Sequence, residues 1–140
     1  MRDITLKIVG KNDINNDEDT IEFTTDGKMY EKNGSLYLVY EESEICGMPG
    51  CKTSLKLGAD RVKMARFGRN KEKTTEMEFE KGARYANHYS TDYGIFNLEI
   101  LTHEMQNSIT YDDGGTLVLD YYISLNGLGE AHNRLTVTVM

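Results

Sequence analysis

The stretch LVLDYYI, residues 117–123, decides the fold, because Leu117, Leu119, Tyr121 and Ile123 occupy every second position in it. Alternation with a period of two residues is typical of a β-strand that has one face in a core and the other in solvent. The same alternation recurs from one end of the chain to the other. Its other segments are Ile4, Leu6, Ile8; Ile21, Phe23; Val62, Met64; Met77, Phe79; Phe96, Leu98, Ile100; and Leu135, Val137, Val139.

Turn-forming residues separate these segments. Asn33-Gly34 is the strongest hairpin signal, Asp26-Gly27 and Lys81-Gly82 predict further turns, and residues 12–19 form a polar stretch that we expect to be a loop. The pattern predicts an all-β protein of about eight to ten strands. Closing such a sheet removes its exposed edges, so a single antiparallel up-and-down β-barrel is favoured, with a two-sheet sandwich as the alternative.

Composition narrows the classes of function. The 140 residues predict one domain, residues 1–140, and carry 16 Lys+Arg against 23 Asp+Glu, a formal net charge of −7. An acidic chain disfavours nucleic acid and anionic membrane surfaces as partners. The sequence contains no apolar run of membrane-spanning length, and MRDITLKIVG at its start lacks the apolar core of a signal peptide. We therefore expect a cytoplasmic protein that binds neither nucleic acid nor membrane.

Strand alternation also sorts polar residues by face, although a one-residue slip in register would reverse the assignment. Arg66 follows Val62 and Met64 on the inward face, and Asn133 precedes Leu135. A buried arginine needs a partner, which an anionic ligand or the inward Glu42 would supply. The simpler alternative is that Arg66, near the Gly68 turn, reaches solvent at the rim. The candidate ligand-binding residues are Arg66, Tyr40, Glu42, Tyr85, Asn87, Tyr89 and Tyr121.

The tyrosines of this set have a plainer explanation. The chain has nine tyrosines and no tryptophan. Tyrosine walls give a cavity apolar surface with orienting hydroxyls, but tyrosine also favours strands for reasons of packing alone.

No catalytic, metal-binding or cofactor-binding motif occurs in the sequence, so we expect no cofactor and no metal. Cys46 and Cys51 bracket a tight loop and are expected to be free thiols, and His132 is expected at the surface. An enzyme is the least favoured hypothesis, since Arg66 and Glu42 form the one candidate pair that strand alternation offers.

The chain resembles the YwiB-like bacterial proteins, a small family of uncharacterised function. The pieces that carry the resemblance are Thr24-Thr25-Asp26-Gly27, Leu36 to Glu42, Arg66-Phe67-Gly68, Gly94 to Glu99 and His132 to Val139. The resemblance implies a lipocalin-like (calycin-type) antiparallel barrel in the bacterial cytoplasm. It implies no activity, ligand or catalytic residue. The lipocalin Gly-x-Trp signature is absent, because the sequence has no tryptophan.

Two functional hypotheses follow. In the first, the barrel interior binds a small, anionic ligand. In the second, the protein is an interaction or homodimerisation module without a small-molecule ligand. The second is suggested by strands with apolar residues on both faces, where Tyr37 and Val39 alternate with Leu36 and Leu38, and Val118 and Tyr122 with Leu119 and Tyr121.

Overall fold

A computed structural model describes residues 1–14, 17–41, 52–58, 60–68, 73–91, 94–127 and 129–140, with the backbone alone described at residues 14, 73–75, 89–91, 96 and 125. The described residues form ten strands. They are β1 (Arg2–Ile14), β2 (Asp17–Lys32), β3 (Ser35–Glu41), β4 (Lys52–Leu57), β5 (Val62–Phe67), β6 (Lys73–Phe79), β7 (Arg84–Thr91), β8 (Gly94–Asn107), β9 (Gly115–Leu125) and β10 (Glu130–Val139).

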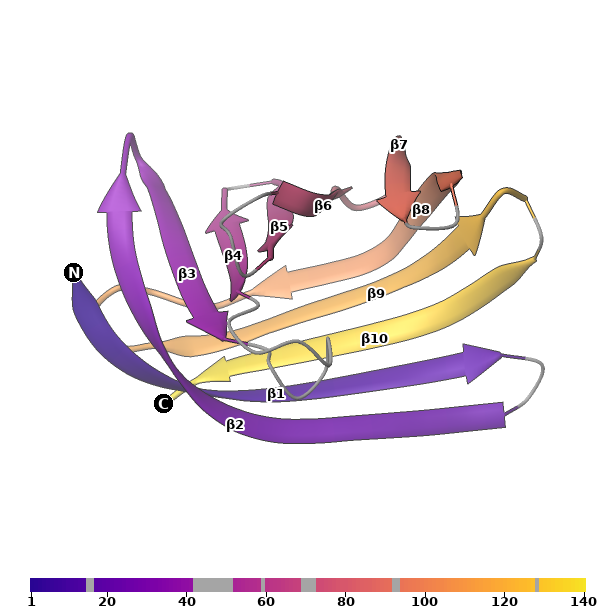
Figure 1. The fold of residues 1–140 in the computed structure, drawn as a ribbon. Coiled ribbons are helices and arrows are strands. Elements are labelled where there is room, and N and C mark those ends of the chain that lie inside the picture. Colours follow the sequence, from indigo (N-terminus) through magenta and orange to yellow (C-terminus); the bar gives the residue numbers. More distant parts are fainter. Residues whose placement is uncertain (15–16, 42–51, 59, 69–72, 92–93, 128) are drawn as a thin grey trace.

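All ten strands belong to one antiparallel sheet with the order β6-β5-β4-β3-β2-β1-β10-β9-β8-β7. Strands that are neighbours in sequence therefore pair, except for β6 and β7 at the two ends of this order. The ladder between β1 and β10 joins the two ends of the chain, with Leu6 opposite Val139. The sheet curls into a nearly closed barrel in which β4, β5 and β6 lie across the interior from β9, β10 and β1 (Figure 1). The predicted up-and-down barrel of about eight to ten strands is confirmed.

The barrel closes at a seam between β6 and β7, the two ends of the strand order. In the part of the chain that the structure describes, no backbone ladder joins these two strands, and two side chains of β7 reach the backbone of β6 instead. The Tyr85 hydroxyl donates to the Glu76 carbonyl oxygen at 3.4 Å, and Asn87 Nδ2 donates to the same oxygen at 3.3 Å. These donors give an edge carbonyl the partner that a neighbouring strand would otherwise supply.

The core fills one end of the barrel. Leu6, Leu38, Leu55, Ile100 and Leu119 are fully buried on its inner face. Along β1 the inward-facing positions change from the buried Ile4, Leu6 and Ile8 to the half-buried Gly10 and Asn12. The apolar core therefore ends near Ile8, and the interior beyond it is lined by smaller and more polar residues.

The structure corrects two predictions about turns. Asp26-Gly27 is not a turn, because β2 runs through it and both residues pair with β1 and Gly27 also with β3. A Cβ atom on Gly27 would lie 2.6 Å from the Val39 carbonyl oxygen and 2.7 Å from Leu6 Cδ1, so the glycine allows close approach of neighbouring strands. The predicted loop at residues 12–19 is also wrong, since Asn12 pairs with Asp19 in an extension of the β1–β2 ladder.

The hairpin signal at Asn33-Gly34 is confirmed. These two residues connect β2 and β3, and both have positive φ angles, 53° for Asn33 and 80° for Gly34. Positive φ at both central positions is the geometry of a type I′ turn, whose twist matches that of the strands it joins. At Asn33-Gly34 the turn that these residues favour falls where the strand pairing ends, whereas at Asp26-Gly27 the strand pairing continues through the residues that favour a turn.

Candidate ligand-binding pocket

A pocket of about 260 Å³ lies on the inner face of the barrel, beyond the end of the apolar core. Side chains from five strands meet around it, because β1, β2, β9 and β10 extend past Ile8 and the last residues of β5 face them. The lining residues are Ile8, Gly10, Lys11, Asn12, Asp19, Ile21, Phe23, Arg66, Tyr121, Asn133, Arg134 and Leu135.

Arg66 brings a cation to this pocket. It is half-buried and follows the buried Val62 and Met64 on the inward face of β5, as the alternation predicts. The pairing of β5 with β6 shifts register between Arg66 and Phe67. Such an irregularity bends the strand locally and re-aims the side chains beside it. The guanidinium has a planar set of donors suited to carboxylate or phosphate oxygens.

Three further polar side chains lie in a row across β1, β10 and β9. Asn12 is opposite Asn133, and Asn133 is opposite Tyr121. Within the described part of the chain, the Oδ1 atom of Asn12 is buried without a hydrogen-bond partner. Asn133 Nδ2 donates to the Ala131 carbonyl oxygen at 3.4 Å. The Tyr121 ring packs edge-on against the ring of Phe79, the last residue of β6, with centroids 4.8 Å apart. This contact holds the Tyr121 side chain in place.

Apolar side chains form the rest of the wall. Ile8 is buried, and Phe23 and Leu135 are partly buried against the core. Ile21 faces inward on β2 and is 52% exposed. The pocket therefore combines one cation, the carboxylate of Asp19 opposite Asn12, amide and hydroxyl groups, and apolar surface on a single concave face, the composition expected of a small-molecule site.

The structure brings together two of the seven candidate residues, Arg66 and Tyr121. Tyr40 is 2% exposed within the core, and Tyr85 and Asn87 close the seam. Glu42 lies outside the described residues, as does the side chain of Tyr89. Cys46 and Cys51 also lie outside them, so their expected thiol state stays a prediction.

Sequence reasoning missed Gly10, Asn12 and Ile21 as parts of one site. Asn12 was overlooked because it begins the polar stretch to Asp19, which resembles a loop, and Gly10 because it has no side chain to mark a face. Continuing the alternation of Ile4, Leu6 and Ile8 through Gly10 to Asn12 would have placed both on the inner face.

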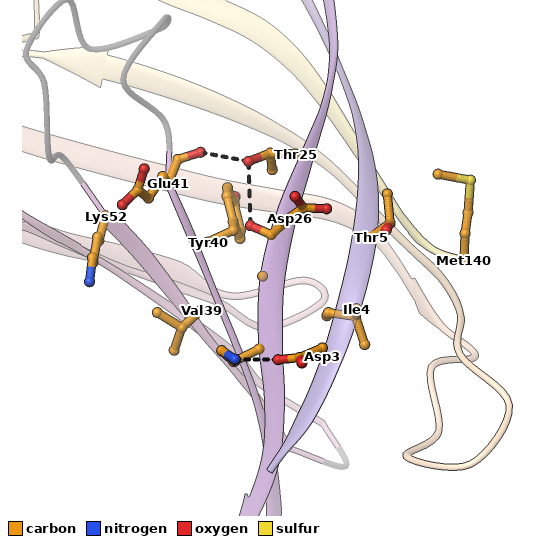
Figure 2. A pocket seen from close by; sticks show the side chains of 12 residues that line it. Asp3, Ile4, Thr5, Thr25, Asp26, Val39, Tyr40, Glu41, Lys52 and Met140 are labelled. Atoms are coloured by element: carbon orange, nitrogen blue, oxygen red, sulfur yellow. Dashed lines mark hydrogen bonds and ion pairs between the residues drawn. The ribbon is translucent and has the colours of Figure 1, made fainter.

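A second, larger cleft of about 740 Å³ lies where β1 to β4 run side by side near Met140 (Figure 2). Its polar groups interact largely with each other. Lys28 forms an ion pair with Asp3, and the Thr25 hydroxyl donates to the Glu41 carbonyl oxygen at 3.3 Å. The hydrogen bond and charge of Lys28 lower the pKa of the Asp3 carboxyl. Tyr40 contributes to this cleft and not to the pocket that contains Arg66.

On the outer face, a polar network ties β9 to β10. Asp120 is 7% exposed, and its two oxygens contact His132 Nε2 at 2.5 Å and Arg134 Nη1 at 3.4 Å. The Tyr122 ring stacks on the His132 ring with centroids 4.8 Å apart. His132 is thus on the outer face, where alternation places it, and its Asp120 contact gives a shielded carboxylate its partner.

Tyr85 gives the seam a dependence on pH. Burial raises the pKa of the Tyr85 phenol above its ordinary value of 10.0, and the Glu76 and Glu78 carboxylates raise it further. Since the folded-state pKa exceeds that of the unfolded chain, this contribution to stability is complete below pH 10 and is lost as the pH rises through the folded-state value. A phenolate also cannot donate to the Glu76 carbonyl.

We expect Tyr85→Phe to cost about 0.5 kcal/mol near neutral pH, the low end for a neutral hydrogen bond. Above pH 10, the free energy of unfolding of the variant should fall less steeply with increasing pH than that of the wild type. Urea denaturation between neutral and alkaline pH measures both effects, and absorbance titration of the phenols should show that the variant has lost one group that ionises above pH 10. Parallel alkaline slopes for the two proteins would contradict the assignment. Tyr30→Phe, on the outer face, is the control.

Across the described ranges, no three His, Cys, Asp or Glu side chains gather closely enough to hold a metal ion. The same residues include no helix with the length and apolarity needed to cross a bilayer.

Comparison with known proteins agrees with the fold. The chain is 26% identical over 135 residues to the uncharacterized beta-barrel protein YwiB of Bacillus subtilis (strain 168), covering 96% of this chain and 91% of the relative. The crystal structure of the ywiB protein from Bacillus subtilis superposes with a TM-score of 0.81 at 23% identity, covering 98% of this chain and 89% of that one. A family profile matches residues 6–137. The protein therefore belongs to the family described as domain of unknown function DUF1934.

Proposed function

We propose that this protein binds a small anionic molecule on the inner face of its barrel, with Arg66 as the anchoring cation. The observation that carries the proposal is the convergence of Arg66, Tyr121, Asn133 and Asn12 on one pocket with apolar walls. Scattered polar residues on an inner face would be ordinary, but a charged group, amides and apolar surface around one concavity are the parts of a ligand site.

The size and charge of the pocket define the ligand. At about 260 Å³ it is smaller than the ~300–1,000 Å³ typical of sites for drug-sized molecules, so it suits a compact ligand. The chain has a net charge of −7, which repels anions at long range, so an anion has to be held by the local cation and its hydrogen bonds. Arg66 supplies that local positive charge, because Lys11 and Arg134 alternate with the inward residues and Arg134 contacts Asp120 on the outer face.

The test measures how much binding depends on Arg66. A thermal-shift screen of small carboxylates and phosphate esters, with native mass spectrometry of the gently purified protein, identifies a ligand, and calorimetry gives its Kd. We expect Arg66→Gln to weaken binding by about tenfold to a hundredfold, because a charge-assisted hydrogen bond contributes about 1.5–3 kcal/mol. Arg66→Lys should weaken it less, since the charge remains but the planar pair of donors is lost.

Arg61→Gln is the matched control. Arg61 is exposed outside the pocket and contacts Glu78 at 3.6 Å and Glu80 at 3.1 Å, so its substitution changes net charge equally without altering the pocket. It should leave the Kd nearly unchanged. A protein that binds no anion in the screen and carries none on purification, or one whose affinity ignores Arg66, would overturn the proposal.

The alternative, an interaction or homodimerisation module, receives less support from the outer face. Tyr30 stacks on Tyr37 with centroids 5.0 Å apart, Lys56 Nζ lies 6.0 Å from the centre of the Tyr37 ring, and Tyr122 stacks on His132. These outer aromatic side chains thus cover one another within the chain. Light scattering at high protein concentration distinguishes the alternatives, because a stable dimer would favour the interaction module.

A further inference from the structure

Gly10 lines the pocket without a structural need for glycine. Its backbone lies outside the left-handed region of φ, and a Cβ atom built on it would meet nothing within 4 Å. By contrast, a Cβ on Gly27 would overlap the Val39 carbonyl oxygen at 2.6 Å. Glycine inside a strand weakens the strand and often marks a bulge, a tight bend or a place that a ligand or another backbone approaches closely. The ladders of β1 run through Gly10 without a register shift, so it does not mark a bulge.

Asn12 adds an independent observation on the same strand face. It lies two residues beyond Gly10, about 7 Å along the strand, and both line the pocket. Its Oδ1 atom is buried and lacks a hydrogen-bond partner among the described residues. A buried acceptor without a donor is costly, so this oxygen is suited to an N–H or O–H group of a bound molecule.

From these two features we infer the class of the ligand: a planar aromatic carboxylate that also carries a hydrogen-bond donor. This inference rests on the proposed function. The flat ring lies against the bare backbone of Gly10, its carboxylate faces Arg66, and its N–H or O–H group donates to Asn12 Oδ1. Ile8, Phe23 and the exposed Ile21 supply the apolar contacts for the ring.

Planarity follows from the space above Gly10. Removing a side chain from a strand opens a shallow hollow between the neighbouring side chains of its own strand, Ile8 and Asn12. A flat aromatic ring can lie against the backbone in such a hollow, whereas a branched chain would meet the backbone with its methyl groups. The volume of about 260 Å³ accommodates a molecule with one ring and leaves little room for a long tail.

The experiment compares three probes by calorimetry: 4-hydroxybenzoate, benzoate, which lacks the donor, and 4-hydroxybenzyl alcohol, which lacks the charge. We expect 4-hydroxybenzoate to bind about fivefold to tenfold more tightly than benzoate, the worth of one buried hydrogen bond. Asn12→Ala should abolish that difference while leaving benzoate binding unchanged. The alcohol should bind weakly and should not respond to Arg66→Gln.

Gly10→Ala is the sharpest variant, because its effects on binding and stability have opposite signs. A methyl group on the floor of the pocket should weaken 4-hydroxybenzoate binding at least tenfold. The thermal midpoint should stay the same or rise, since alanine fits the open space and favours the strand more than glycine does. Val9→Ala, the neighbouring position on the opposite face, is the control and should leave the Kd unchanged.

The outcomes separate this inference from the proposed function. Benzoate and 4-hydroxybenzoate binding that depends on Arg66 but not on Gly10 or Asn12 overturns the aromatic-donor assignment and leaves the anion site standing. Failure of every carboxylate and phosphate ester to bind overturns both. A fall in the thermal midpoint of Gly10→Ala would show a structural role for Gly10 and would also overturn the assignment.

Discussion

Gly115→Ala should lower the free energy of unfolding by about 3 kcal/mol or more, a large loss for the addition of one methyl group. Two independent effects combine at this position. The φ angle of Gly115 is 138°, a region that side-chain-bearing residues rarely adopt. An added Cβ would also lie 2.4 Å from the Ser108 carbonyl oxygen and 3.0 Å from Ile109 Cα.

The clash at Gly115 cannot be relieved by a rotamer change, because the atoms it meets are backbone. Ser108 N donates to the Thr116 carbonyl oxygen at 2.9 Å, and Thr116 N donates to Ser108 Oγ at 3.0 Å. Moving the Ser108 backbone would therefore break the contacts that connect β8 to β9. Urea denaturation followed by circular dichroism measures the loss.

Gly82→Ala is the matched control for Gly115→Ala. Gly82 also has a positive φ angle, 79°, but a Cβ built on it meets nothing within 4 Å. It should cost about 1–2 kcal/mol, the strain of a left-handed conformation alone. Equal losses in the two variants would show that the close approach to Ser108 contributes nothing.

Phe79→Ala should cost about 3–5 kcal/mol, a large part of the ~5–15 kcal/mol that stabilises a typical domain. Phe79 is fully buried at the end of β6, where it pairs with Val62 and its ring packs edge-on against Tyr121. Removing the ring leaves a cavity between β6 and β9. Among the described residues no backbone ladder joins β6 to β7, so this ring contact is one of the interactions that hold β6 against the opposite wall of the barrel.

Two further variants test the argument for Phe79. Phe79→Leu keeps most of the apolar volume and should lose clearly less stability than Phe79→Ala. Ile95→Ala removes a side chain that is 72% exposed and should change stability by no more than about 0.5 kcal/mol. A loss from Phe79→Ala as small as that from Ile95→Ala would contradict the packing assigned to the ring.

The sequence predicts which face of a strand each residue occupies, but not its height along the barrel. Alternation correctly placed Arg66 and Tyr121 on the inner face. It placed Tyr40 and Tyr85 on the inner face too. Neither lies at the pocket, because Tyr40 is in the core and Tyr85 is at the seam. Height depends on how far neighbouring strands are staggered, and that stagger is set by pairing between distant segments.

The errors at Asp26-Gly27 and residues 12–19 have one cause. Both segments carry residues typical of turns, yet both are extended, because β1 and β2 pair along their whole length from Arg2 opposite Met29 to Ile14 opposite Asp17. A continuous ladder satisfies every backbone group that a local turn would leave to solvent. Local turn chemistry therefore decided the structure at Asn33-Gly34, where strands end, and lost to the ladder at Asp26-Gly27 and at residues 12–19.

The ladder between β1 and β10 determines how this chain must assemble. All the other ladders join strands that are adjacent in sequence. The strands β1 to β6 and β7 to β10 can therefore each form as a meander from local hairpins. Joining Leu6 to Val139 instead closes almost the entire chain into a loop. Since the entropy of loop closure grows only as (3/2)RT ln n, the two preformed meanders can dock along one ladder at modest cost. Folding should thus be limited by a single late encounter between the chain's two ends.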